Sequence, residues 1–287
     1  MSEVILVTGS NGQLGKDVEI LFSKNGYEVY GYSREQLDIT KLDNVSKVFE
    51  EIKPSIVIHC AAYTNVDKAE TDADEAYKVN AIGTRNIASI SEKYSAKLVY
   101  ISTDYVFNGE SNGEYNEFSP TSPLGVYGKS KLAGEDFVRA LTSKFFIVRT
   151  SWVFGLYGKN FVKTMLNLAQ DKKELNVVND QRGCPTYTVD LAHCISRLIR
   201  TEKYGTYHCS NSGNCTWYEF AKAIFEEAGF DMKVTPVGTE EFPRPAKRPT
   251  NSVFDHMSLR LNEFPEMRNW REALRTFIKE LAIEGNK

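Results

Sequence analysis

The sequence has few of the features that would give it a disulfide framework, a metal site or a membrane anchor. Its five cysteines are scattered and none forms a C-x-x-C pair, which argues against both disulfides and zinc. The four histidines show no spacing typical of metal ligands, so we expect no metal site. Apolar runs are too short to cross a bilayer, and the first, at 4–7, lacks the basic flank of a signal peptide. We therefore expect a cytoplasmic protein in a reducing compartment.

An excess of charge of one sign is missing as well. The formal net charge is −3 at pH 7, and acidic and basic residues are interleaved along the chain. A basic stripe or a polybasic run would be needed to attract nucleic acid or an anionic membrane, so we expect neither partner. With 287 residues, 41% hydrophobic and 25% charged, the chain has the composition of a globular protein that can bury its own core.

Short β-branched runs alternate with helical periodicity in the first half of the chain. Apolar spacing predicts strands and helices in turn, the strands at 4–7, 28–32, 55–59, 97–101 and 145–149 and the helices at 13–23, 45–52 and 72–94. Strand and helix in alternation predict right-handed crossovers and a parallel sheet, and hence an α/β fold.

After about residue 151 the pattern is less regular. Glycines and a proline-rich stretch at 236–249 predict a smaller second lobe of loops and short helices. We expect residues 1–150 to form one domain, to which the segment at about 180–205, with a helix at 188–200, returns. Residues 151–287 would mainly form the second lobe, and an amphipathic helix at 270–283 would close the chain.

A glycine-rich segment, 8–15, lies between the first predicted strand and the first predicted helix. Glycine lets the backbone turn tightly and approach a pyrophosphate, whose charge the helix N-terminus then meets. In isolation the G-x-x-G-x-x-G spacing could be a simple turn, but its place between strand and helix favours a Rossmann-type dinucleotide site. The candidate cofactor residues are Gly9, Asn11, Gly12, Gln13, Leu14 and Gly15.

Tyr127 and Lys131 are four residues apart, and Thr103 stands at the end of a predicted strand. On a helix, Tyr127 and Lys131 share one face, and we expect the ammonium to lower the phenol pKa from about 10 towards neutrality. Such a phenol can exchange a proton with a substrate oxygen, to which Thr103 can also hydrogen-bond. Alone, a Y-x-x-x-K pair is more often an exposed helix pair. With the glycine loop and Thr103 beside it, the catalytic interpretation is favoured.

The end of the second predicted strand bears on the choice of cofactor. It reads Tyr32-Ser33-Arg34, without the acidic residue that would bind the ribose 2′-hydroxyl of NAD, whereas Arg34 can meet the 2′-phosphate of NADP. We therefore expect NADPH, with NADH accepted as well. Asp38 can act as a cap before Lys41, and the family resemblance described next implies, as the alternative, a contact to the adenine end.

These motifs resemble those of the extended short-chain dehydrogenase/reductase family, and in particular its dTDP-4-dehydrorhamnose reductase group. The matching segments run through nearly the whole chain, at 8–15, 37–40, 61–70, 102–109, 180–186 and 248–252. For the cofactor, the resemblance adds Ile39, Ala61, Ala62, Tyr63 and Asn80 to the candidates. It also implies that Asn80 holds the geometry of the central helix, although from the residues alone Asn80 could be a capping or surface residue. The resemblance further implies that Tyr127 protonates the substrate, Lys131 holds the nicotinamide ribose and Thr103 stabilises the oxyanion.

For the nucleotide-sugar substrate, arginine and tryptophan are the side chains of interest in the second lobe. Arginine offers forked donors to a diphosphate, and tryptophan offers a stacking face to a base or a sugar. Each is individually more often a surface or packing residue. The candidate substrate residues are Thr103, Asp104, Val106, Trp152, Asn160, Arg182 and Arg248, with Arg244 beside them.

The resemblance implies NADPH-dependent reduction of the C4 ketone of dTDP-4-dehydro-6-deoxy-L-mannose to dTDP-L-rhamnose. A related dehydratase or epimerase is the first alternative, although Tyr105 follows Asp104 where dehydratases carry the glutamate of an Asp-Glu pair. Another reductase of nucleotide sugars is also open. A third alternative, from outside catalysis, is an NADP-binding regulatory subunit like the β subunit of methionine adenosyltransferase. Members of the group include dimers, and the sequence leaves a homodimer open.

Overall fold

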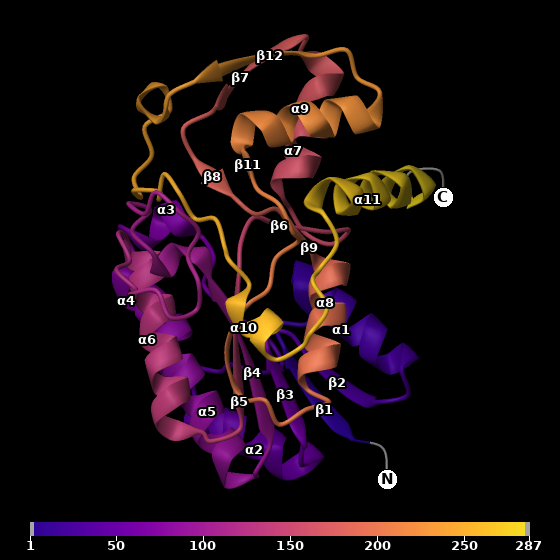
Figure 1. Cartoon of the computed structure of the whole chain (residues 1–287). Coiled ribbons are helices and arrows are strands. Elements are labelled where there is room, and N and C mark those ends of the chain that lie inside the picture. The colour runs from indigo at the N-terminus through magenta and orange to yellow at the C-terminus, as the bar shows by residue number, and fades with distance from the viewer. Residues whose placement is uncertain (1–2, 285–287) are drawn as a thin grey trace.

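The computed structural model describes residues 3–284, and a six-stranded parallel sheet forms its centre (Figure 1). The strand order is β10-β5-β4-β3-β1-β2, and every neighbouring pair is parallel. The strands are β1 (Val4–Thr8), β2 (Glu28–Tyr32), β3 (Ile56–His59), β4 (Lys97–Thr103), β5 (Phe145–Thr150) and β10 (Gly205–His208). The Rossmann-type α/β fold expected from the sequence is confirmed.

Helices cover both faces of the sheet. Successive residues of a strand point to opposite faces, and here the residues on both faces are apolar, so each face must be buried. Ile5 and Val7 of β1 lie in one buried cluster with α1 and α8, and Leu6 lies in another with α2 and α5. The helices of this half are α1 (Gln13–Lys24), α2 (Leu42–Ile52), α3 (Val66–Ala69), α4 (Ala73–Tyr77), α5 (Thr84–Lys93), α6 (Val126–Leu141) and α8 (Thr188–Leu198), with a 3-10 turn η2 (Asp104–Val106).

The second lobe packs above the sheet in Figure 1 around its own aromatic core. Phe154, Phe220 and Phe277 lie at the centre of that core and are almost fully buried. The elements are β6 (Val153–Phe154), α7 (Phe161–Asp171), β7 (Glu174–Val178), β8 (Arg182–Gly183), β9 (Thr186–Tyr187), β11 (Cys215–Thr216), α9 (Trp217–Ala228), β12 (Lys233–Val237), η3 (Thr239–Glu241), α10 (Met257–Leu261) and α11 (Trp270–Glu284). Of these, α10 packs against β10 of the sheet.

Three features differ from the sequence-based predictions. The helix expected over 72–94 contains a π-helical turn, Lys78–Gly83, between α4 and α5. The sixth strand, β10, was not predicted, because Gly205 and His208 are poor indicators of a strand. The second lobe holds helices of 11 and 12 residues, α7 and α9, where largely loops and short helices were expected. The predicted division at residue 150 stays a prediction.

The topology itself determines where a ligand can bind. From β1 the chain passes to β2 on one side and then returns across β1 to β3 on the other. At such a switch point the connections diverge and leave a crevice at the carboxyl ends of the strands. None of the helices within residues 3–284 is both long and apolar enough to span a membrane.

Candidate active site

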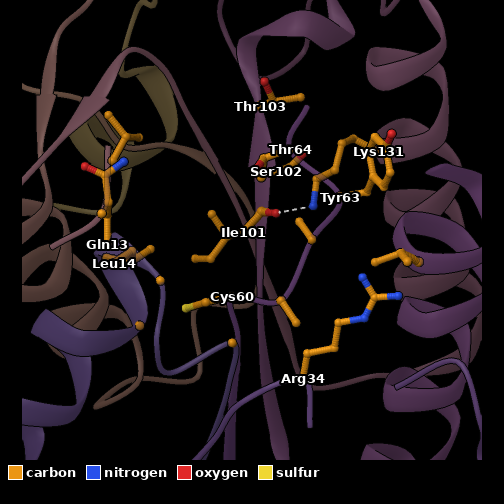
Figure 2. Close-up of a pocket in the computed structure, with 18 of the residues that line it drawn as sticks. Gln13, Leu14, Arg34, Cys60, Tyr63, Thr64, Ile101, Ser102, Thr103 and Lys131 are labelled. Carbon is orange, nitrogen blue, oxygen red and sulfur yellow. Dashed lines mark hydrogen bonds between the residues drawn. The ribbon is translucent and has the colours of Figure 1, made fainter. Parts of the chain in front are cut away.

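A cavity of about 870 Å³ opens at the carboxyl ends of β1, β3 and β4, in the crevice of the switch point. This cavity, which we call the first cavity, has the size of a small-molecule site. Most of the predicted site residues line it, namely Gly9, Asn11, Gly12, Gln13, Leu14, Gly15, Arg34, Asp38, Ile39, Ala61, Ala62, Tyr63, Thr103, Asp104, Tyr127, Lys131 and Trp152. Figure 2 shows Gln13 and Leu14 on one side and Lys131 on the other.

The glycine loop between β1 and α1 needs its glycines for close backbone approach. Gly9 has φ +67°, and a Cβ there would lie 2.8 Å from the backbone of Ala61. A Cβ on Gly15 would lie 2.3 Å from the Gly9 carbonyl oxygen. Gly12 is the N-cap of α1 and has no side chain to occupy the first-turn N–H groups, and the first-turn residues Gln13–Gly15 line the cavity. This end of α1 is therefore suited to an anionic group such as a pyrophosphate.

Helix α6 carries Tyr127 and Lys131 to the opposite wall. It begins after Gly125, where Glu70 accepts a hydrogen bond from the Val126 backbone N–H (2.8 Å) and caps the helix. A Cβ on Gly128 would lie 2.2 Å from the Tyr105 carbonyl oxygen, so this glycine lets α6 approach the end of β4. That approach brings Tyr127 beside Thr103, and both line the cavity.

The Lys131 amine points to the sheet rather than to the Tyr127 phenol. It donates to the Ile101 carbonyl oxygen (2.6 Å, dashed in Figure 2) and lies 4.1 Å from the centre of the Tyr100 ring. Burial lowers the pKa of Lys131 to about 7, and Glu135 partly offsets this. The amine is thus a buried group that can gain or lose its charge near neutrality.

The predicted lowering of the tyrosine pKa by this lysine is wrong in this structure. Burial raises the pKa of Tyr127 well above its ordinary value, Asp104 and Tyr105 raise it further, and only the Thr103 hydroxyl lowers it. The physical reason is that the ammonium is turned towards β4, where the Ile101 carbonyl holds it. Tyr127 is consequently a protonated phenol at neutral pH.

Asn80 lies in the π-helical turn and is buried outside the first cavity. Its side-chain oxygen accepts from the Tyr63 backbone N–H (2.8 Å), and its amide donates to the Tyr63 carbonyl oxygen (3.1 Å) and to the Ser130 hydroxyl (3.0 Å). Asn80 thus ties the cavity wall at Tyr63 to α6. Its placement favours a supporting role over direct cofactor contact.

At the far end of β2, Arg34 lines the cavity but is 78% exposed and pairs with Glu75 (3.0 Å). Glu35, which was not singled out from the sequence, lines the same cavity and accepts from the Ser33 hydroxyl (2.6 Å). Asp38 accepts from the Thr40 backbone and hydroxyl (3.1 and 2.7 Å). Asp38 therefore holds the turn before α2, and because it also lines the cavity, its contact to the adenine end stays a prediction.

Trp152 lines the first cavity, and one of its two faces is already covered. The ring of Trp217 covers one face of Trp152, with ring centres 3.5 Å apart and an angle of 7° between the planes. A Cβ on Gly183 would lie 2.5 Å from the same indole. Trp152 also has φ +45°, a conformation that costs energy outside glycine. Trp152 packs against Trp217 and Gly183, and this packing stabilises its strained backbone conformation.

A second cavity of about 1030 Å³ lies in the second lobe, beside α7 and β7. Arg244 and Arg248 line it together with Phe161 and Trp217, two aromatics that sequence analysis did not identify. Arg248 pairs with Asp67 (3.2 Å) and has one nitrogen, Nη1, buried with no hydrogen-bond partner within residues 3–284. Because Trp152 lines the first cavity and Trp217 the second, their stack separates the two.

Three predicted substrate residues are not among the residues that line either cavity. Val106 is fully buried in a small hydrophobic cluster. Asn160 caps α7 by accepting from the Lys163 backbone N–H (3.0 Å), and its amide donates to Gln13 (2.9 Å), so its polar atoms are already engaged. Arg182 is 50% exposed and faces Glu219 (3.6 Å). Tertiary packing gave these side chains structural partners that sequence spacing does not reveal.

The Rossmann-type fold, the open helix N-terminus and the buried tyrosine and lysine define the class as NAD(P)-dependent oxidoreductases. Residues 2–283 match the family described as "RmlD substrate binding domain", and the chain belongs to that family. The resemblance seen in the sequence is confirmed.

Among residues 3–284, no three His, Cys, Asp or Glu side chains gather where they could hold a metal ion.

Two curated relatives and one solved structure match over almost their full lengths. The spore coat polysaccharide biosynthesis protein SpsK of Bacillus subtilis is 45% identical over 276 residues, covering 96% of this chain and 97% of that protein. A dTDP-4-dehydrorhamnose reductase of Aggregatibacter actinomycetemcomitans is 40% identical, covering 94% and 97%. The crystal structure of the dTDP-4-dehydrorhamnose reductase of Bacillus anthracis in complex with NADP matches with a TM-score of 0.96 and 52% identity, covering 98% and 100%.

Proposed function

We propose that this protein reduces the C4 ketone of dTDP-4-dehydro-6-deoxy-L-mannose with NADPH to give dTDP-L-rhamnose. The observation that carries the proposal is the meeting of Thr103, Tyr127 and Lys131 in the cavity bordered by the glycine loop. The family and the printed names of the relatives support the same reaction.

The residues of the first cavity suit a dinucleotide. The α1 N-terminus at Gly12 would receive the pyrophosphate, and Arg34 would meet a 2′-phosphate. Lys131 and Tyr127 would hold the nicotinamide end. When bound, NADPH supplies the hydride for the reduction.

Tyr127 is the group that donates a proton to the substrate. Its raised pKa keeps the phenol protonated at neutral pH, so it can donate to the C4 oxygen as negative charge develops there. Thr103 would hydrogen-bond the same oxygen. The buried Lys131 amine has a pKa of about 7. In its charged form it would place a positive charge beside Tyr127 and orient the nicotinamide ribose.

The nucleotide part of the substrate fits the second cavity. Nη1 of Arg248, which has no hydrogen-bond partner within residues 3–284, and the neighbouring Arg244 offer donors to a diphosphate. Phe161 and Trp217 offer apolar surface to a base. The sugar would then pass the edge of Trp152 to reach Tyr127.

Dehydration is less well supported. Tyr105 stands where a dehydratase would have its second acidic residue, and burial raises the Tyr105 pKa to about 12, so this phenol is a poor base at neutral pH. A purely regulatory, NADP-binding role leaves unexplained why Thr103, Tyr127 and Lys131 all meet in one cavity.

The test is to incubate the protein with NADPH and the dTDP-linked 4-keto-6-deoxy sugar, offering each C5 epimer separately. We expect loss of absorbance at the nicotinamide band and formation of dTDP-L-rhamnose, identified by chromatography against a standard. NADPH binding without turnover of either epimer would contradict the proposal and favour the regulatory role.

We further propose that the protein works in the cytoplasm and needs neither nucleic acid nor a membrane as partner. The five cysteines are free thiols, which suits a reducing compartment. A homodimer remains a prediction, and analytical ultracentrifugation of the purified protein decides between monomer and dimer.

A further inference from the structure

Asp104 follows Thr103 at the carboxyl end of β4, and it lines the first cavity although it is only 2% exposed. Its Oδ1 accepts a hydrogen bond from the Thr103 hydroxyl (3.1 Å). Its Oδ2 is buried and has no hydrogen-bond partner in the part of the chain that the structure describes. Buried carboxylate oxygens are usually paired, so an unpaired one beside reacting groups needs an explanation.

The Thr103 hydroxyl has a single hydrogen, which limits what it can do. Its oxygen accepts from the Tyr105 backbone N–H (3.2 Å), and its hydrogen goes to Asp104. An ionised carboxylate can only accept, so it draws this hydrogen away from the substrate. A protonated carboxyl can donate to the Thr103 oxygen instead, which frees the hydroxyl hydrogen.

We propose that Asp104 is a positioning residue that sets the direction of the Thr103 hydroxyl. When its carboxyl is protonated, Asp104 donates to Thr103, and Thr103 donates to the C4 oxygen of the substrate. Each group keeps its own hydrogen, and Tyr127 remains the proton donor. This inference rests on the proposed reductase function and adds a pH-sensitive element to the same site.

The surroundings of Asp104 place this change close to neutrality. Burial raises the pKa of Asp104 to about 6, and the hydroxyls of Ser252 and Thr103 lower it in part. The Ser252 hydroxyl lies 3.3 Å from the Arg182 carbonyl oxygen, and no hydrogen-bond partner within residues 3–284 reaches Oδ2 of Asp104. Both forms of the carboxyl are therefore populated at accessible pH.

The other titratable groups that face Asp104 keep one form over this range. Burial raises the pKa of Tyr105 to about 12 and that of Cys184 to about 11, and the pKa of Tyr127 is also raised. Arg248 and Asp67, which act on Tyr105 from its other side, pair with each other. Lys131, with a pKa of about 7, is a second group in the cavity whose charge changes near neutrality.

The experiment measures the rate of hydride transfer from pH 5 to 8 by rapid mixing, with saturating NADPH and keto sugar. For a carboxyl of pKa about 6, the protonated fraction falls about tenfold between pH 5 and 7, and the parent rate should fall with it. In Asp104→Asn and in Thr103→Val, the rate of hydride transfer should no longer fall near pH 6. Only the decrease near pH 7, which comes from loss of the Lys131 charge, should remain. Thr103→Ser keeps the hydroxyl and should keep the fall.

Persistence of the fall near pH 6 in Asp104→Asn or in Thr103→Val would overturn the inference. Thermal unfolding of each variant checks that it is folded, and if Asp104→Asn does not fold, the Thr103→Val and Thr103→Ser pair still decides. A parent enzyme that reduces the sugar with no fall near pH 6 overturns this inference alone. A parent that reduces no keto sugar overturns the proposed function instead.

Discussion

The walls of the two cavities differ in whether backbone or side chains form them. The first is formed by backbone at strand ends, by the glycine loop and by buried side chains such as Thr103 and Lys131. The second is formed by long side chains of the second lobe, among them Arg244 and Trp217. Close approach of two backbone segments can be recognised in the sequence, because few residues other than glycine tolerate it. A wall of arginine and aromatic side chains cannot be recognised in this way, because such side chains can reach a cavity from many positions in the sequence.

The largest expected effect separates the chemistry from binding. Tyr127→Phe keeps the ring and deletes the proton donor, so kcat should fall about 10²–10⁴-fold, the usual contribution of a general acid. The Kd for NADPH should stay nearly unchanged, as fluorescence titration can measure. Tyr27→Phe, which removes a phenol just before the edge strand β2 and outside the lining of the first cavity, is the matched control. Turnover within about threefold of the parent would make the assigned mechanism untenable.

Lys131→Met extends that test to cofactor binding. It removes the amine that we place against the ribose, so both kcat and NADPH affinity should fall, whereas Tyr127→Phe affects kcat alone. Stopped-flow kinetics and titration measure the two quantities separately. Loss of kcat with unchanged affinity would remove Lys131 from the ribose site.

The next effect tests the backbone character of the first cavity. Gly12→Val places a branched side chain at the open end of α1, where φ is −77° and an added Cβ would lie 3.2 Å from the Gly9 carbonyl oxygen. Overpacking costs about 1–3 kcal/mol, so the Kd for NADPH should rise roughly 5–150-fold, and thermal unfolding measures how much of that cost falls on the fold itself. Gly113→Val, at an exposed glycine with open space around it, is the control. Parent-like titration of Gly12→Val would show that the diphosphate is placed wrongly.

A smaller effect tests whether the second cavity serves the sugar nucleotide. Trp217→Leu removes the ring stacked on Trp152, and aromatic pairs contribute about 0.5–1.5 kcal/mol, so KM for the keto sugar should rise roughly 2–12-fold. The Kd for NADPH should not change. Tyr218→Leu alters the next residue of α9, which lies outside both cavities, and serves as the control. A rise in the NADPH Kd would instead show that the stack supports the first cavity.

The smallest effect concerns the choice between NADPH and NADH. Arg34→Ala should weaken NADPH roughly fivefold and NADH hardly at all, because an exposed and already paired arginine contributes only about 1 kcal/mol to a phosphate contact. Glu75→Gln frees the guanidinium and should strengthen NADPH binding. Equal losses for both cofactors in Arg34→Ala would exclude it from the 2′-phosphate site.

Much of the fold follows from local pattern. The strand predicted at 28–32 has the observed bounds, and the four others end within two residues of them, because alternation and turn residues act over short stretches. The four-residue strand β10 carries too little pattern to detect, and only its pairing with β5 makes it a strand. The π-helical turn at Lys78–Gly83 likewise has no periodic signal, although Asn80 depends on it.

For the site, the sequence by itself determined the residue types at the first cavity: the glycines at a tight turn, and Tyr127 and Lys131 one helical turn apart. Those properties are local, and neighbouring residues enforce them. Tertiary structure alone decided that Lys131 turns to Ile101, that Asn160 is engaged by Gln13, and that Trp152 stacks on Trp217. The residues in each of those contacts are 30 to 147 positions apart in the sequence. Each polar or aromatic group could have had other partners, and only the folded chain decides which one lies beside it.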